Sequence, residues 1–184
     1  MRPIIITGRL ASGKTVASQF FVSKYNLQPY SMATWLKTAI KDHYHIDKIE
    51  KNMEINDKSI RKVMQDLGKY MRIIDINWHV DEVINNLMNN KDHNKFVVDD
   101  IRFKNEIERL NEFNPITIKI ISDNKKRLER AILRDSRVPT EDEMNDISEL
   151  EVDEIMVDYE IENNSDIYDL QNKLGEIYEK EKYK

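Results

Sequence analysis

The sequence predicts an α/β protein whose core is a parallel β-sheet covered by helices on both faces. Short apolar runs at residues 4–6, 95–100 and 115–121 are typical of buried strands. Segments with apolar residues at helical spacing separate these runs, and strands that alternate with helices pair in parallel. The length of 184 residues suits one domain, residues 1–184, and the chain shows no linker or internal repeat.

The expected elements follow in chain order. The strand at 4–6 leads into a helix at about 13–25, and a short strand at 28–32 leads into a helix at 33–44. After an irregular stretch at 46–56, Asp57 is expected to cap a helix that ends near Ile73. Further helices are expected at 77–89, 103–113, 124–137 and 167–178, and further strands at 95–100, 115–121 and, more weakly, 158–163.

The segment "IIITGRLASGKT", residues 4–15, contains two of the four glycines in the chain. The spacing of Gly8, Gly13, Lys14 and Thr15 matches the Walker A pattern, in which backbone N–H groups at a helix N-terminus surround phosphate oxygens. Lys14 is expected to reach the β and γ phosphates of ATP, and Thr15 to offer its hydroxyl to Mg²⁺. The simpler alternative is a glycine turn before a helix. The predicted nucleotide-binding residues of this loop are Gly8, Ala11, Ser12, Gly13, Lys14 and Thr15.

Composition excludes several classes of site. The chain has no cysteine, which excludes disulfides and thiolate metal sites and favours the cytoplasm. The four histidines show no metal-ligand spacing beyond His43 and His45, so the only metal expected is nucleotide-borne Mg²⁺. No apolar run approaches the roughly 20 residues of a membrane span, and no signal peptide precedes the first strand.

Charge is unevenly distributed along the chain, whose net charge is −5. Residues 1–100 carry 15 basic and 12 acidic groups, whereas residues 101–184 carry 14 and 22. Residues 141–162 hold eleven acidic groups and no basic one. A long nucleic-acid backbone would be repelled there, so a small anionic ligand held by local positive groups fits better.

The helix "RKVMQDLGKYMR", residues 61–72, carries a polar ridge beside an apolar stripe. At about 100° per residue, Arg61, Gln65, Gly68 and Arg72 fall on one side of the helix. A mid-helix glycine costs about 1 kcal/mol relative to alanine, so Gly68 suggests a close approach to the backbone. Lysines outnumber arginines by 19 to ten, and two arginines on one ridge suggest bidentate oxyanion contacts. The alternative is an ordinary solvated face.

Four arginines share one side of the helix "KKRLERAILRDSR", residues 125–137. Like charges at this spacing repel in isolation, and a bound anion would relieve that repulsion. The functional interpretation is a lid that closes over the transferring phosphates. A surface helix balanced by acidic neighbours is the alternative. The arginines are Arg127, Arg130, Arg134 and Arg137.

The strand "FVVDD" ends in Asp99 and Asp100, which are expected to lie opposite the phosphate loop because ligands bind beyond the carboxyl ends of parallel strands. A carboxylate there can hold Mg²⁺ or orient an acceptor oxygen. Arg102 could pair with Asp100 or reach a phosphate. One of the two aspartates could instead only cap the helix at 103–113.

These motifs resemble, in order and spacing, the deoxynucleoside monophosphate kinases of tailed phages, a branch of the P-loop nucleotide kinases. The segments that carry the resemblance are "ITGRLASGKT", "MATWLK", "RKVMQDLGKYMR" followed by Trp78, "DDIRFKNE" and "DYEIENNSDIYDL". The resemblance covers nearly the whole chain. It implies a three-layer P-loop kinase fold with five parallel strands in the order 2-3-1-4-5. It also implies a helical substrate-binding segment at about 33–92 and an arginine lid at about 124–150.

The resemblance implies an activity and a set of site residues. The reaction is Mg-ATP plus a deoxynucleoside monophosphate giving ADP and the diphosphate, in the host cytoplasm if the chain is phage-encoded. Thr15, Asp99 and Asp100 are the implied metal ligands, and Arg127 and Asn164 join the loop in binding ATP. The implied catalytic residues are Lys14, Asp100, Arg102, Arg130 and Arg134. The implied substrate-binding residues are Lys37, Arg61, Gln65, Gly68, Arg72, Trp78, Arg102 and Arg137.

Two other hypotheses remain open from the sequence. One keeps the chemistry and changes the acceptor to a hydroxymethylated base, free or in DNA, or to another small metabolite. The other is a nucleotide-binding module without catalysis, against which the intact Lys14, Thr15, Asp100 and Arg102 argue. Base specificity and oligomeric state stay undetermined, although kinases of this kind are commonly homodimers.

Overall fold

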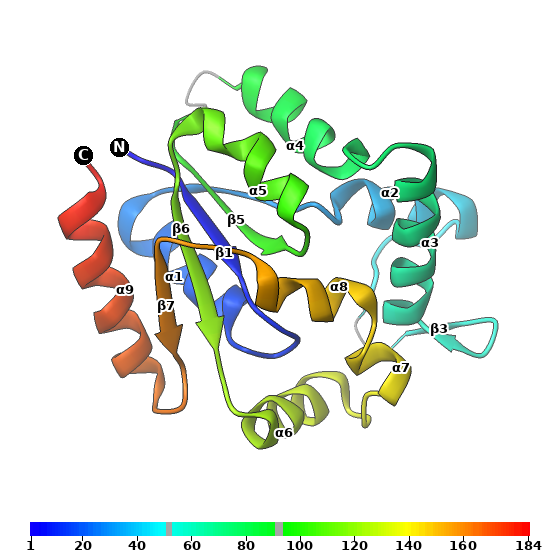
Figure 1. Cartoon of the computed structure of the whole chain (residues 1–184). Coiled ribbons are helices and arrows are strands. Elements are labelled where there is room, and N and C mark those ends of the chain that lie inside the picture. The colour runs from blue at the N-terminus through cyan, green and yellow to red at the C-terminus, as the bar shows by residue number, and fades with distance from the viewer. Residues whose placement is uncertain (51–52, 91–93) are drawn as a thin grey trace.

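A central five-stranded parallel sheet organises the molecule (Figure 1). The computed structural model describes residues 1–50, 53–90 and 94–184. The sheet order is β2-β5-β1-β6-β7, which is 2-3-1-4-5 when only its own strands are numbered along the chain, so the expected order is confirmed. Its strands are β1 (Ile4–Thr7), β2 (Gln28–Tyr30), β5 (Phe96–Ile101), β6 (Ile116–Ile121) and β7 (Tyr159–Glu162).

Helices cover both faces of this sheet (Figure 1). The long helices are α1 (Lys14–Tyr25), α2 (Thr34–Tyr44), α3 (Ile60–Ile74), α4 (Trp78–Met88), α6 (Asn124–Asp135) and α9 (Ile167–Glu181). The shorter helical elements are α5 (Lys104–Leu110), η1 (Asn111–Phe113), α7 (Glu141–Met144), α8 (Ile147–Leu150) and η2 (Glu151–Glu154). In the part of the chain that the structure describes, no helix is long and apolar enough to cross a bilayer.

The alternation of side chains along β1 separates two apolar layers. Ile4 and Ile6 pack with residues of α1 and α9, among them Phe21 and Tyr178, on one face. Ile5 packs on the other face with residues of α4 and α5, among them Leu87. Because both faces are buried, the central strands are apolar along most of their length, as is typical of parallel sheets.

The start of α3 differs from the sequence expectation. Residues 54–59 form an antiparallel hairpin of β3 (Glu54–Ile55) and β4 (Lys58–Ser59), with Asp57 in its turn at φ 60°. The hydroxyl of Ser59 accepts a hydrogen bond from the amide of Lys62, so Ser59 and not Asp57 is the N-cap. The expectation for Asp57 was wrong because a turn requiring positive φ also favours aspartate.

The structure places the other predicted elements close to their expected bounds. The segment at 33–92 holds α2, the hairpin, α3 and α4, and its residues 51, 52, 91 and 92 lie outside the described residues, as does His93. Helix α6 ends two residues early because Ser136 adopts the left-handed conformation at φ 55°. The glycine loop and the last residues of β5 lie at the same edge of the sheet, as expected.

Candidate active site

The glycine loop between β1 and α1 has a backbone that requires its glycines. Gly8 and Gly13 have φ of 146° and 113°, which L side chains rarely adopt. A Cβ at Gly8 would lie 2.5 Å from the carbonyl oxygen of Ile120, and one at Gly13 would lie 2.3 Å from Nδ2 of Asn163. Glycine is therefore required at both positions for two reasons: the backbone has a positive φ, and a side chain would clash with neighbouring atoms.

Side chains from distant elements hold the loop by its carbonyl groups. Asn163 donates to the carbonyl of Ser12 at 2.8 Å, Arg127 to that of Leu10 at 3.2 Å, and Arg102 to that of Gly8 at 3.2 Å. The loop carbonyls therefore face these donors. The first amides of α1 have no intrahelical partner because they lie at the N-terminus of the helix, and such amides can bind an anion. The loop therefore offers unpaired backbone amides at a helix N-terminus, an arrangement that can bind phosphate.

Lys14 is folded back onto the loop. Its Nζ donates to the carbonyl oxygens of Gly8 at 2.6 Å and Arg9 at 2.8 Å, and the residue is only 8% exposed. Burial, and next the positive charge of Arg102, lower the pKa of the Lys14 ammonium well below its ordinary value. The nearby carboxylates of Glu149, Asp99 and Asp100 act in the opposite direction, and a bound phosphate would add to their negative charge.

The carboxylates at the end of β5 have different environments. Asp100 accepts hydrogen bonds from the hydroxyl of Ser31 at 2.6 Å and from the amides of Met32 at 2.8 Å and Ala33 at 3.1 Å. It therefore anchors the turn before α2, and it does not cap the helix at 103–113. For Asp99, burial and next the charge of Asp100 raise the pKa to about 6. A cation beside Asp99 would relieve this crowding of negative charge. Because the Asp100 carboxylate is held by the turn before α2, Asp99 is the carboxylate left for Mg²⁺, a hard cation that prefers oxygen ligands.

Arg102 pairs with a carboxylate that is distant in sequence. Its guanidinium lies 2.9 Å from Glu149 Oε2, and the same oxygen accepts a hydrogen bond from the Leu10 amide at 2.6 Å. Glu149 is 2% exposed and joins α8 to the glycine loop. The expected pairing of Arg102 with Asp100 is replaced by this contact.

A cavity of about 700 Å³ lies between α2, α3 and the end of β5, and we call it the arginine cavity. Glu149 and Arg102 line it and also contact the glycine loop, so the cavity and the loop are neighbours. The apolar part of its wall includes Leu36, Ile60, Met64, Ile76 and Phe103. The predicted site residues that line it are Lys37, Arg61, Gln65, Gly68, Arg72, Asp100 and Arg102.

The polar groups of α3 in this cavity are only partly satisfied. Arg72 donates to Glu106 at 2.6 Å and lies over the Phe103 ring at 3.8 Å, and its Nε is buried without a partner in the described chain. The Nε of Arg61 is likewise unpaired within the described residues, as is Oε1 of Gln65. Unpaired buried polar atoms are costly, so these groups are suited to a ligand that supplies both acceptors and a donor.

The four lid arginines all contact protein groups and do not line the arginine cavity. Arg130 donates to Ser122 and to the carbonyl of Asn163, and Arg127 is 4% exposed against the loop. Arg134 binds Asp135 through two nitrogens at 2.5 and 2.6 Å. Arg137 binds Glu143 through two nitrogens, both at 2.7 Å.

Asp135 joins this helix to α3. Its carboxylate is 1% exposed and also lies 3.4 Å from Arg61. Burial lowers the pKa of Arg61, and the nearby positive charge of Arg134 lowers it further. The predicted catalytic Arg134 and the predicted substrate-binding Arg61 therefore share one carboxylate.

Some predicted residues lie away from the arginine cavity. Trp78 does not line it, and its ring lies 5.5 Å from that of Trp35. Asn164 accepts hydrogen bonds from Ser122 and Asp123 at the end of β6. Gly68 lines the cavity, but a Cβ there would meet protein atoms only at ordinary contact distances of 3.5 Å or more, so the surrounding protein does not require glycine.

Sequence reasoning missed several residues that shape the site. The resemblance places the turn at 163–165 beside the ATP adenine, but only Asn164 was named as a binding residue. Asn163, which directly follows β7 at the ligand-binding edge of the sheet, is the residue of this turn that holds the loop. Glu106 accepts from Arg72 and from the amides of Arg102 and Phe103. Its place as the capping-box glutamate three residues after Phe103, the N-cap of α5, was the available signal. Glu143 was also missed as the partner of Arg137, whereas Asp135 is one of the acidic neighbours that the sequence offered to balance the arginines.

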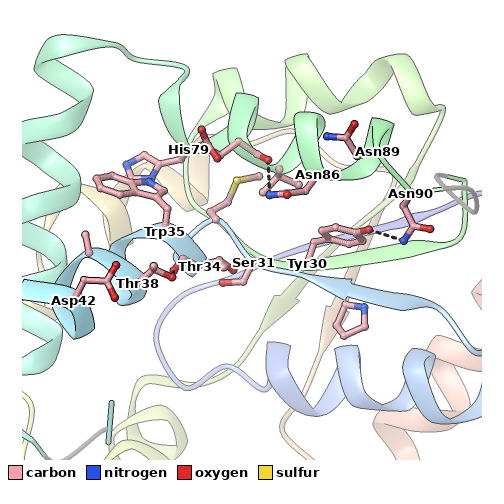
Figure 2. Close-up of a pocket in the computed structure, with 15 residues that line it drawn as sticks. Tyr30, Ser31, Thr34, Trp35, Thr38, Asp42, His79, Asn86, Asn89 and Asn90 are labelled. Atoms are coloured by element: carbon pink, nitrogen blue, oxygen red, sulfur yellow. Dashed lines mark hydrogen bonds between the residues drawn. The ribbon is translucent and has the colours of Figure 1, made fainter. Parts of the chain in front are cut away.

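A second, wider cavity of about 1010 Å³ opens between β2, α2 and α4, and we call it the outer cavity (Figure 2). Its lining includes Tyr30, Trp35, Asp42 and Glu82, and among the described residues it contains no lysine or arginine. Of the residues that the structure describes, Met32 and His79 line both cavities. The described lining of the outer cavity offers no cation to a phosphate, so the arginine cavity is the candidate for an anionic acceptor.

No family model and no curated protein matches this sequence. Solved structures do match the fold. A shikimate kinase from Acinetobacter baumannii in complex with shikimate has a TM-score of 0.59 at 17% identity, over 100% of this chain and 96% of that one. A gluconokinase from Sinorhizobium meliloti 1021 has a TM-score of 0.57 at 12% identity, over 99% and 96%.

A shikimate kinase from Aquifex aeolicus vf5 gives a TM-score of 0.54 at 12% identity, over 98% of this chain and 97% of that one. These neighbours are P-loop kinases, so the predicted fold class is confirmed: the chain has the three-layer P-loop kinase fold. At such low identity the likeness shows the fold and leaves the acceptor to be argued from the site.

Proposed function

We propose that the protein is a Mg-ATP-dependent nucleoside monophosphate kinase whose acceptors are deoxynucleoside monophosphates. The observation that carries the proposal is the arginine cavity, which brings Lys37, Arg61 and Arg72 together beside a phosphate-binding loop. Guanidinium groups bind phosphate through two parallel hydrogen bonds. The described lining of the cavity holds seven lysine and arginine residues against five carboxylates, an excess of positive charge that suits an anionic acceptor better than a neutral one.

The shape and chemistry of the cavity also suit a nucleoside. A volume of about 700 Å³ lies within the usual range of small-molecule sites. Apolar side chains such as Leu36 and Phe103 can pack against a base. The Gln65 amide donates to the carbonyl of Glu143 at 3.3 Å, so its unpaired Oε1 is left to accept a base N–H. The preference for deoxyribose rests on the sequence resemblance alone.

Each loop residue has a defined role in this proposal. The amides around Gly13 and the ammonium of Lys14 would hold the donor phosphates, with Lys14 exchanging two carbonyl partners for phosphate oxygens. Thr15 and Asp99 would hold Mg²⁺, which neutralises the charge of the phosphates when it is bound. Arg134, which is bound to Asp135 in the structure, would exchange this carboxylate for phosphate oxygens and so stabilise the charge that develops between donor and acceptor.

ADP release with Mg-ATP over a panel of acceptors tests the proposal. The panel contains the eight common ribo- and deoxyribonucleoside monophosphates, two 5-hydroxymethylated deoxynucleotides, shikimate and gluconate, with the Lys14→Ala variant as the blank. We expect turnover that depends on a deoxynucleoside monophosphate and disappears in the variant. Turnover with a hydroxy acid instead, or ATP binding without any acceptor-dependent turnover, would refute the proposed acceptor.

A further inference from the structure

His79 is the ring that separates the two cavities. It lies in the first turn of α4, is 2% exposed, and lines both the arginine cavity and the outer cavity. Figure 2 shows it beside Trp35 at one end of the outer cavity. A buried imidazole between two cavities is a group whose hydrogen bonds connect their walls.

The hydrogen bonds of His79 define its protonation. Indole Nε1 of Trp35 lies 3.0 Å from Nδ1 of His79, and an indole N–H can only donate. Nδ1 must therefore carry a lone pair, which makes the ring neutral with its proton on Nε2. Nε2 lies 3.4 Å from the carbonyl oxygen of Gly68 on α3 and donates to it.

The surroundings of His79 keep it neutral. Burial, and next the positive charge of Arg72, lower the pKa of the ring to about 4. Hydrogen bonds to the backbone of Gly68 and Met32, and then the charge of Asp100, act in the opposite direction, but the effect of each on the pKa is smaller than that of burial. Around neutral pH the ring is thus uncharged, with Nδ1 as a hydrogen-bond acceptor and Nε2 as a donor.

The carbonyl that His79 contacts also holds Arg72. Nη1 of Arg72 donates to the Gly68 oxygen at 3.3 Å, while Nη2 binds Glu106 at 2.6 Å. The Arg72 guanidinium is therefore held by two hydrogen bonds, one to Glu106 and one to the Gly68 carbonyl oxygen. The same carbonyl oxygen is the hydrogen-bond partner of His79. Movement of that carbonyl would move Arg72 within the arginine cavity.

We infer that His79 is a positioning residue of the acceptor site: held as the Nε2-protonated tautomer by Trp35, it fixes the Gly68 carbonyl and so sets the position of Arg72. The inference rests on the acceptor role proposed above for Arg72. Trp35, which faces the outer cavity, belongs to the same chain of hydrogen bonds and acts through His79.

The tautomer is measured first, because it does not depend on any activity. Nitrogen-15 NMR of the histidine rings at pH 7.5 should show His79 as the neutral Nε2-protonated form. In Trp35→Phe, which removes the indole donor and keeps an aromatic ring, this preference should be lost. A ring protonated at Nδ1 or on both nitrogens in the wild type would overturn the inference.

Kinetics then separate positioning from structural support. His79→Leu removes both hydrogen bonds, and we expect the KM for the acceptor to rise about tenfold, while the KM for ATP and kcat stay within about twofold of the wild type. His79→Gln returns an N–H that can reach the Gly68 carbonyl and should restore most of the acceptor KM. The matched control is His43→Gln, a change at an exposed histidine of α2.

The outcomes distinguish this inference from the proposed function. Calorimetry without ATP measures binding of the acceptor monophosphate to the wild type and to His79→Leu, so weaker binding in the variant supports the inference even if turnover is absent. Absent turnover in the wild type counts against the proposed function alone. An unchanged acceptor KM and affinity in a folded His79→Leu variant, or an equal rise in the KM for ATP, would overturn the role of His79.

Discussion

Acidification should destabilise the protein through His79 before it protonates most carboxylates. The pKa of His79 is lowered from 6.5 to about 4 in the folded chain, with burial as the largest cause and the charge of Arg72 next. Between these values the unfolded chain binds the proton and the folded chain does not, so stability is full above about pH 6.5 and falls as pH decreases toward 4. Since one pKa unit corresponds to about 1.4 kcal/mol, the loss between pH 7.5 and 4.5 is about 2.5 kcal/mol.

Urea unfolding at both pH values, in the wild type and in His79→Gln, isolates this contribution. Titration of the carboxylates occurs in both proteins and largely cancels in the difference. The difference in unfolding free energy between wild type and variant should shrink by about 2.5 kcal/mol at the lower pH, which corresponds to roughly 5–10 °C in Tm for a chain of this length. A difference that stays constant within about 0.5 kcal/mol would refute the assignment of a buried neutral ring.

Three substitutions test the donor and acceptor sites. Gly13→Ala places a methyl group against Asn163 at a strained φ, so it should lower the free energy of unfolding by about 2 kcal/mol or more and weaken ATP binding. Gly175→Ala is the control and should have neither effect, because its neighbours lie no closer than 3.5 Å. Equal effects of the two substitutions would contradict the loop geometry. Lys14→Ala should abolish turnover with an unchanged circular dichroism spectrum, and retained activity would remove Lys14 from catalysis. Arg61→Lys keeps the positive charge but loses the two parallel hydrogen bonds of a guanidinium, so the KM for the acceptor should rise about tenfold while the KM for ATP stays unchanged. An unchanged acceptor KM would exclude phosphate binding by Arg61.

The sheet and the glycine loop could be predicted because their signals are local. Three apolar runs predict the strands β1, β5 and β6, and the spacing from Gly8 to Thr15 predicts the turn that precedes α1. The hairpin before α3 could not be predicted in the same way. Its strands are two residues long, and Asp57 suits a turn as well as a helix cap.

The cavity was predicted in part. Helical periodicity placed Arg61, Gln65 and Arg72 on one ridge, and that ridge lines the arginine cavity. The partners of these side chains come from residues 34 to 78 positions away, as with Glu106 for Arg72. No periodicity in the sequence reports such contacts, because only the tertiary fold brings the elements together.

The carboxylates show where residue type alone misleads. Asp99 and Asp100 are adjacent in sequence, but Asp100 is bound by the turn before α2 while Asp99 has a raised pKa. The sequence hypothesis named both as metal ligands and only Asp100 as catalytic. Their difference depends on the alternation of a strand, which directs neighbouring side chains to opposite faces.

The central claim is that the acceptor oxygen belongs to a phosphate group, and phosphorus-31 NMR of the reaction mixture tests it most directly. With Mg-ATP and a deoxynucleoside monophosphate, we expect the acceptor resonance to be replaced by the two coupled signals of a phosphoanhydride, and no such change with Lys14→Ala. A new uncoupled phosphate ester signal, formed on a hydroxyl, or an acceptor resonance that persists while ATP is bound, would contradict the account.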